Sequence, residues 1–207
     1  MGETIQTLLE QLGESQSAKR RAAAKKLRKL RAVTAGPALL AALEREVRDP
    51  RTWETQYQMI MALGESGYRE ALPFLETLAR QPLEATMVYV ALGDAIVRLS
   101  QSGPSDLSPV LKRLRESQNP MLLDGAFRAM AMLRLVPDSA EMIEIISHVT
   151  KLSPDDGLRF WVAAAAPGWR GSHVSAFIED CALSARPDLQ EAASLARIGR
   201  YKQWRPL

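Results

Sequence analysis

Cysteine and histidine are scarce in this chain of 207 residues. Cys181 is the only cysteine, so an intramolecular disulfide framework is excluded, and a lone cysteine suits a reducing compartment. The two histidines, His148 and His173, have no metal-ligand spacing, and neither belongs to a His-Glu pair. We therefore expect no disulfide, no metal and no cofactor.

Long apolar runs and catalytic motifs are also missing. No apolar stretch approaches the ~18 residues that a membrane span needs, and the first residues lack the layout of a signal peptide. The sequence has no phosphate-binding loop, dinucleotide fingerprint or nucleophile elbow. The carboxylate pair Asp155 and Asp156 suits a helix end better than acid–base chemistry. We predict a soluble, cytoplasmic, non-enzymatic protein that does not contact membranes.

What the sequence does contain is an internal repeat marked by proline. Pro37, Pro73 and Pro109 are spaced by 36 residues each, and each opens an apolar segment with helical spacing. A second proline series marks fresh helix starts, at Pro50, Pro82, Pro120, Pro154 and Pro187. The sequence therefore predicts an all-α chain of helical hairpins, with no strands. The predicted helix pairs are 3–15 with 17–33, 36–48 with 51–66, 69–80 with 83–101, 105–117 with 120–136, 138–152 with 155–166, and 172–185 with 187–203.

The second helices of these pairs resemble HEAT repeats, whose second helix reads V-R-x-A-A-A-x-A-L-G. The resemblance rests on the KRRAAAKKL segment at 19–27, on the Ala-Leu-Gly endings at Gly64 and Gly93, and on Leu158-Arg159 ahead of an alanine run. The short period is most similar to the compact HEAT-like repeats of phycobilisome lyases. The resemblance implies a right-handed α–α superhelix (an α-solenoid) of about six HEAT-like hairpins. Its concave face would be lined by the second helices, and one domain would span 1–207, with repeats at about 3–33, 36–66, 69–101, 105–136, 138–166 and 172–203.

The outward face of each second helix is the candidate binding surface. On a helical wheel the first of them has an inner apolar arc made of Ala22, Ala23, Leu27 and Leu30. Basic residues line the opposite side of that helix, and the same register selects one stripe on each later second helix. The predicted partner-binding residues are Arg21, Lys25, Arg28, Tyr57, Met61, Val90, Asp94, Asp124, Arg128 and Phe160.

The chemistry of this stripe favours protein as the partner. A groove that follows phosphates needs cations repeated along its length, whereas this stripe is basic only at its start and then becomes aromatic, aliphatic and acidic. We predict a monomeric scaffold or adaptor that holds a protein or peptide on its concave face. It would act as an assembly factor or as an inhibitor or immunity-type partner. The basic C-terminal segment with Arg197, Arg200, Lys202 and Arg205 is interpreted as the cap of the array.

The alternative is a nucleic-acid-binding or DNA-repair protein that uses the basic helix at 17–33, which holds most of the cations of the first 35 residues. HEAT-like alkylpurine DNA glycosylases combine a basic groove with tryptophans and an aspartate. The same ingredients occur here without a matching motif, in Trp53, Trp161, Trp169 and Trp204 and in Asp94 and Asp124. A lyase or hydroxylase activity, which would require a bound chromophore or metal, is a third possibility.

Overall fold

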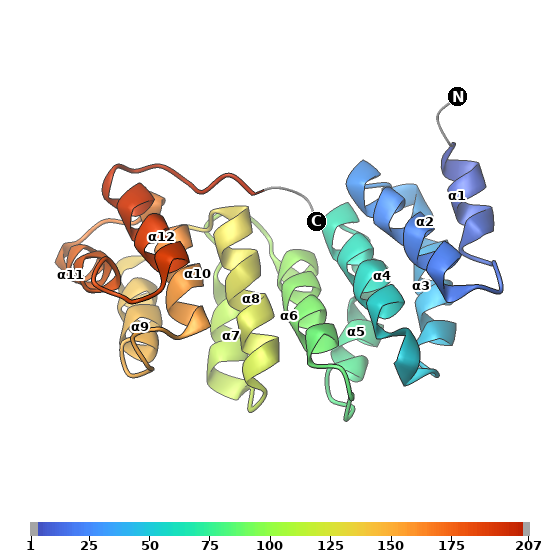
Figure 1. The fold of residues 1–207 in the computed structure, drawn as a ribbon, viewed down its shortest axis with the longest axis horizontal. Coiled ribbons are helices and arrows are strands. Elements are labelled where there is room, and N and C mark those ends of the chain that lie inside the picture. The colour runs from blue at the N-terminus through green and yellow to red at the C-terminus, as the bar shows by residue number, and fades with distance from the viewer. Residues whose placement is uncertain (1–3, 205–207) are drawn as a thin grey trace. The chain divides into compact units, whose positions relative to one another are not determined.

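The structure is a computed structural model that describes residues 4–204. Within this range the chain forms α-helices joined by turns and short 3₁₀ helices, with no strand (Figure 1). The helices are α1 Ile5–Gln11, α2 Ser17–Leu30, α3 Gly36–Glu46, α4 Trp53–Ser66, α5 Leu72–Leu78, α6 Thr86–Ser100, α7 Ser108–Glu116, α8 Pro120–Leu133, α9 Ser139–Val149, α10 Gly157–Ala165, α11 Ser172–Cys181 and α12 Pro187–Arg197. The all-α class is confirmed, and each predicted pair contains its two helices.

Prolines begin these helices as the repeat pattern predicts. Pro37, Pro73 and Pro109 are the second residues of α3, α5 and α7. Pro120 and Pro187 are the first residues of α8 and α12. In the first turn a backbone N–H has no intrahelical acceptor, so its absence costs nothing and the fixed φ of proline suits the helix.

The chain divides into two compact units. The first comprises the residues up to Ser100 together with Ser117–Ala126, and the second comprises Gln101–Glu116 together with the residues from Phe127 onward. α8 contributes its first half to one unit and its second half to the other. One domain over 1–207 and the handedness of the superhelix stay predictions.

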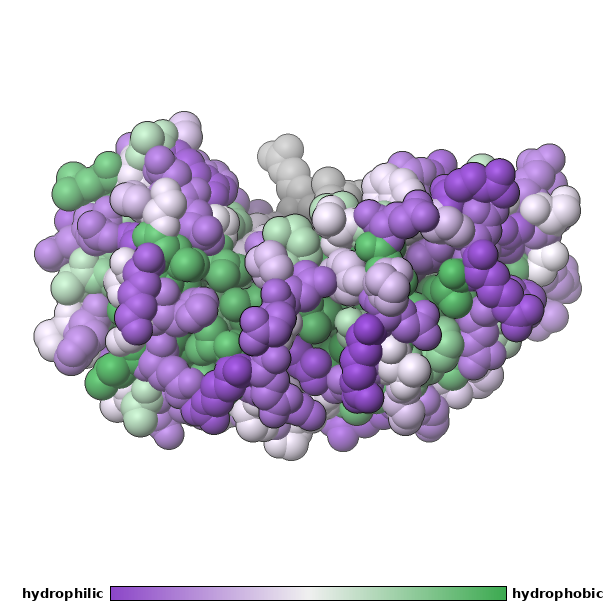
Figure 2. All heavy atoms as spheres, turned by 90° about the horizontal axis from the view of Figure 1, so that it is seen from below, coloured by the Kyte–Doolittle hydropathy of each residue, from purple (hydrophilic) through white to green (hydrophobic). Residues whose placement is uncertain are grey.

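Two layers of helices build the first unit. α4 packs between α2 and α6, while α3 packs against α4 and α5 packs against α6. Each hairpin has too little apolar surface to form a core alone, so neighbouring hairpins bury it between the layers. The buried core includes Leu8, Leu27, Leu43, Met59, Ile60, Leu63, Leu75 and Leu92. On the face drawn in Figure 2, hydrophilic side chains predominate and hydrophobic ones emerge between them.

Glycines allow the second helices of the first unit to approach closely. A Cβ at Gly64 of α4 would lie 2.7 Å from the Cα of Ala95 in α6. A Cβ at Gly93 of α6 would lie 2.0 Å from the carbonyl oxygen of Leu122 in α8. Both glycines end the Ala-Leu-Gly segments that carry the HEAT resemblance. Their role is therefore steric, because any side chain here would push the next second helix away.

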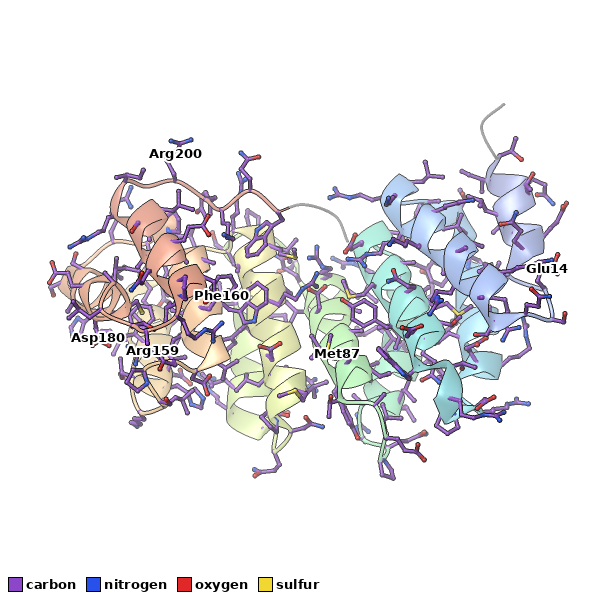
Figure 3. All side chains as sticks on the ribbon, viewed as in Figure 1. Glu14, Met87, Arg159, Phe160, Asp180 and Arg200 are labelled. Carbon is purple, nitrogen blue, oxygen red and sulfur yellow. The ribbon has the colours of Figure 1, made fainter. Side chains whose placement is uncertain are left out.

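In the second unit, α10 packs against α9, α11 and α12. Its buried Arg159 links two of these neighbours: Nη1 donates a hydrogen bond to the carbonyl oxygen of Val149 at 3.4 Å, and the guanidinium forms an ion pair with Asp180 of α11 (Figure 3). The indole Nε1 of buried Trp169 donates to the carbonyl oxygen of Leu135 at 2.9 Å. These bonds satisfy both terminal nitrogens of Arg159 and the indole N–H of Trp169, which would otherwise be costly to bury. Nε of Arg159 has no hydrogen-bond partner within the described residues.

The C-terminal end of the chain differs from the prediction. A helix was expected up to residue 203, but α12 ends at Arg197, and residues 198–204 contain no helix. Gly199 adopts a φ of +67°, which is left-handed backbone that ends a helix readily. The expected helical continuation is therefore wrong.

Residues after Gly199 pack on the second unit. The guanidinium of Arg134 lies 4.6 Å from the ring centroid of Tyr201, and Trp204 packs against Phe160 and Trp161 at centroid distances of 6.1 Å and 5.5 Å. The predicted capping role of this segment stays a prediction, and Arg205 lies outside the described residues.

Candidate functional site

Helices α2 and α4 pack side by side (Figure 1). Side chains of both helices line a groove of about 530 Å³. Trp53 is 37% exposed there, and Tyr57 is half-buried one turn later on the same helix. An exposed tryptophan beside an open groove is unusual, because this side chain is normally highly buried. The residues that line the groove are Ala18, Arg21, Ala22 and Lys25 of α2 and Trp53, Glu54, Tyr57 and Gln58 of α4.

The orientation of α2 opens this groove. Ala23, Ala24 and Leu27 face the core and are buried. Ala22 is exposed and lines the groove, and Leu30 is 55% exposed at the end of the helix. The predicted inner position of Ala22 and Leu30 is therefore wrong. The methyl group of Ala22 leaves space where a longer side chain would fill the groove.

Two of the three predicted basic residues are neutralised by α4. The Arg28 guanidinium donates from Nε and Nη2 to Oε1 of Glu65, at 2.9 Å and 2.7 Å. Arg21 forms an ion pair with Glu54 across the groove. Between them Lys25 is exposed, and it forms no ion pair within residues 4–204. The predicted basic stripe is reduced to one uncompensated cation, because its two arginines form ion pairs with carboxylates of α4.

Met61 was predicted to lie on this surface one turn after Tyr57, but it is fully buried. Arg28 also donates to Oε1 of Gln58 at 3.3 Å, so its guanidinium bridges Gln58 and Glu65, which are two turns apart on α4. The bridge lies across the turn that carries Met61. The predicted outward position of Met61 is wrong, because its side chain is buried in the core of the first unit.

The stripe on α6 is buried as well. Val90 and Asp94 were expected to face a partner, but they are 5% and 0% exposed, so this prediction is also wrong. A Cβ at Gly125 of α8 would lie 2.0 Å from the carbonyl oxygen of Val90 and 2.9 Å from the amide nitrogen of Asp94. This close approach of α8 covers the predicted face of α6.

Asp94 forms an ion pair within α6. Its Oδ1 accepts a hydrogen bond from Nε of Arg98, one turn later. Burial acts to lower the pKa of the Arg98 guanidinium, but the carboxylates of Asp94 and Glu65 outweigh it, and the pKa is raised above its ordinary value. Asp94 is therefore a structural anion and not an open contact.

The remaining predicted residues lie on α8 and α10. Asp124 is half-buried, Arg128 is buried, and both already interact with other residues. Phe160, labelled in Figure 3, is 8% exposed. The rings of Trp161 and Trp204 both pack edge-on against it. The predicted outward positions of Arg128 and Phe160 are wrong. The structure brings together only Arg21, Lys25 and Tyr57 from the predicted set.

Sequence reasoning missed Trp53, Glu54 and Gln58. The predicted stripe on α4 began at Tyr57, whereas the exposed face begins one turn earlier at Trp53. The i, i+4 spacing of the two aromatic residues was the available signal. The positions of Glu54 and Gln58 had no such signal, because their contacts depend on how α2 packs beside α4.

A second polar cluster joins α2, α3 and α4. Buried Glu46 accepts hydrogen bonds from Nε and Nη2 of Arg20 at 2.7 Å and 2.9 Å and from the Ser17 hydroxyl at 2.8 Å. Burial acts to raise the pKa of the Glu46 carboxyl, but these donors lower it below its ordinary value. Since the carboxylate is paired, this cluster holds the three helices together, and a smaller pocket of about 260 Å³ lies beside Arg20 and Glu46.

Other candidate sites would be a group of metal-ligating side chains or the single cysteine. Within residues 4–204, no group of three or more His, Cys, Asp or Glu side chains is placed to hold a metal ion. Burial raises the pKa of the Cys181 thiol to about 11, against the opposing effect of nearby Arg159. A thiol with such a pKa is almost fully protonated near neutral pH and is a poor nucleophile.

Consecutive helical hairpins with packed second helices define the class of this protein as a helical-repeat protein. Residues 19–45 match the family model of the PBS lyase HEAT-like repeat, and the match covers α2 from its third residue and most of α3. The match confirms the resemblance to HEAT-like repeats for this segment, and the packing of consecutive helices is consistent with a helical-repeat array. No curated protein and no solved structure matches the chain. Among the helices of residues 4–204, none combines the length and apolar character of a membrane span.

Proposed function

We propose that this HEAT-like repeat protein is a monomeric, cytoplasmic and non-enzymatic scaffold that binds another protein or a peptide in the α2–α4 groove. The observation that carries the proposal is an open groove in which exposed Trp53 and half-buried Tyr57 face uncompensated Lys25. Aromatic residues at the centre of an interface often dominate its binding energy. Helical-repeat arrays use extended surfaces of this kind for binding, and their rigid helices keep the ordering cost low.

The ion pairs of α2 argue against the nucleic-acid alternative. This helix has seven Lys or Arg residues, and four of them pair with carboxylates of the first unit. A cation already paired with a carboxylate contributes little to the counterion release that drives phosphate binding. The four pairs are Lys19 with Glu14, Arg20 with Glu46, Arg21 with Glu54, and Arg28 with Glu65.

Peptide selection tests the proposed function directly. A displayed library of random peptides is selected on the immobilised wild-type chain, and the enriched peptides are then measured against a Trp53→Ala, Tyr57→Ala double variant. We expect the double variant to lose them, because it lacks both aromatic contacts of the groove. A Leu183→Ala variant is the matched control, since Leu183 is 86% exposed outside the groove.

The two outcomes are distinct. Enriched peptides that bind the control like wild type and fail on the double variant support the groove as the binding site. If the enriched peptides bind the double variant as tightly as wild type, or if none is enriched, the proposed function is wrong. Far-UV circular dichroism of each variant confirms that the fold is kept, and a Trp53→Ala single variant replaces the double variant if the fold of the double variant is lost.

A further inference from the structure

We infer that the segment bound by the α2–α4 groove is an acidic peptide that carries one bulky apolar side chain. The inference rests on the proposed protein-binding function and adds the chemistry of the partner. Three features of the groove carry it: the sign of its uncompensated charge, the chemistry of its walls and its size.

The uncompensated charge of the groove is positive. Arg21 and Glu54 form an ion pair, so their charges largely cancel. Lys25 lies one turn after Arg21 on α2, is exposed and forms no ion pair within the described residues. Lys29 follows one turn later and is also exposed without an ion pair in that range. A carboxylate of a bound peptide would meet Lys25 in the groove, with Lys29 one turn beyond the lining residues, and no free anion among those lining residues would oppose it.

The walls of the groove suit an apolar side chain. Trp53 and Tyr57 are four residues apart on α4, so their rings lie on one face of the helix, one turn from each other. The methyl groups of Ala18 and Ala22 have the same spacing on α2 and line the same groove. An apolar side chain of the peptide would therefore contact methyl groups on one side and aromatic rings on the other. The volume of about 530 Å³ lies within the roughly 300–1,000 Å³ of small-ligand sites, which suits a few side chains of a peptide and not a folded domain.

The same features disfavour a phosphate backbone. A nucleic acid carries a charge at every step and gains affinity from many neutralised phosphates. The groove offers Lys25 as its uncompensated cation, because Arg21 is already paired with Glu54. One or two carboxylates beside an apolar anchor match this arrangement better than a continuous row of phosphates.

A small set of labelled probes tests this partner chemistry by fluorescence anisotropy. The set holds decapeptides rich in Asp and Glu with one central Leu, Phe or Trp. Matched versions have the apolar residue replaced by Ser or the acidic residues replaced by Lys, and a single-stranded DNA oligonucleotide of similar length completes it. We expect the acidic peptides with an apolar residue to bind most tightly and to weaken as salt is raised, because their attraction to Lys25 is screened.

Two variants separate the contribution of charge to peptide binding from that of the apolar contact. Lys25→Glu should weaken binding of the acidic peptides by about tenfold while leaving the apolar preference in place. Trp53→Ala should weaken it by at least about tenfold and remove the preference for an apolar residue. The matched controls are Lys112→Glu, which makes the same charge change at an exposed position of α7, and Leu183→Ala. Both controls should bind like wild type.

Several results would overturn the inference. Tighter binding of the oligonucleotide or of the lysine-substituted peptides would show that the groove does not select acidic peptides. Acidic peptides that bind Lys25→Glu as tightly as wild type would show that Lys25 does not recognise them. Non-acidic peptides that are enriched by selection and lost on the Trp53→Ala, Tyr57→Ala double variant would refute this inference while leaving the proposed function intact. If no enriched peptide loses binding on the double variant, both the inference and the proposed function are wrong.

Discussion

Replacing Gly93 of α6 by alanine tests the close contact between α6 and α8 in the first unit. A Cβ at this position would lie 2.0 Å from the carbonyl oxygen of Leu122 and 3.0 Å from the amide nitrogen of Ala126. Ordinary van der Waals contacts begin near 3.4 Å, so the helices would have to move apart by about 1.4 Å at this point. The obstacle is helix backbone and cannot be relieved by a change of rotamer.

The size of the effect follows from two opposing contributions. Overpacking a well-packed interior typically costs about 1–3 kcal/mol, and a backbone obstacle favours the upper end or more. Alanine in a helix interior recovers about 1 kcal/mol relative to glycine. We therefore expect Gly93→Ala to lower the free energy of unfolding by about 2 kcal/mol. For a chain of this size the melting temperature should fall by roughly 4–8 °C.

Thermal and urea unfolding followed by far-UV circular dichroism measure this change. Gly103→Ala is the matched control, because a Cβ there meets no atom within 4 Å, and its free energy of unfolding should change by less than about 0.5 kcal/mol. Gly125→Ala should reproduce the effect from the α8 side, where the added Cβ meets Val90. The double variant should cost less than the sum, because one separation of the helices relieves both clashes. If Gly93→Ala melts like Gly103→Ala, the reasoning about helix approach is refuted.

Three further predictions concern other buried groups. At about pH 8, iodoacetamide should label Cys181 slowly in the folded chain and rapidly in urea, because burial raises the thiol pKa to about 11. Glu46→Gln should lower the free energy of unfolding by about 2–3 kcal/mol near neutral pH, since it weakens the buried pair with Arg20. The folded-state pKa of Glu46 lies below its ordinary 4.5, so this stability is complete above that value and is lost as the pH falls through the folded-state pKa. Trp204→Ala should lower the free energy of unfolding by about 1–2 kcal/mol, because it uncovers the ring of Phe160.

Each of these predictions has an opposing result. Equal labelling rates of Cys181 in the folded and unfolded chain would contradict its burial. A deficit of Glu46→Gln that stays constant down to strongly acidic pH would contradict a depressed carboxyl pKa. A Trp204→Ala variant as stable as wild type would show that the contact with Phe160 contributes nothing to folding. Trp204→Phe is the matched control in that case, because it keeps an aromatic ring at the same position.

Much of the fold could be predicted from local features of the sequence. The proline series located the helix starts at Pro37, Pro73 and Pro109, because the restricted φ and the missing N–H of proline act on the residue itself. Apolar spacing located the helices between them, since burial of one face depends on the 3.6-residue period of the same segment. Apolar spacing wrongly predicted a helix after Gly199. There Tyr201 and Trp204 pack on residues that are distant in the sequence, and such contacts leave no local signal.

The candidate site was less predictable, because helical periodicity identifies the face toward the core but not the neighbours on the flanks. Arg28 lost its predicted exposure through its pairing with Glu65 of α4, a residue 37 positions later in the sequence. Met61 lost it through burial in the core of the first unit. Phe160 lost its predicted exposure through a ring contact with Trp204.

By itself, then, the sequence determined that this chain is all-α, that its helices form hairpins resembling HEAT repeats, and that α2 is basic. Only the tertiary structure decided that Lys25 remains an uncompensated cation while Arg21 is paired, and that Trp53 joins Tyr57 in a groove. The physical reason is that helix formation and core-facing burial depend on neighbours within about four residues along the chain. Surface charge and accessibility depend instead on the side chains of the adjacent helix. The close packing of the two helices sets which of those side chains lie opposite each other.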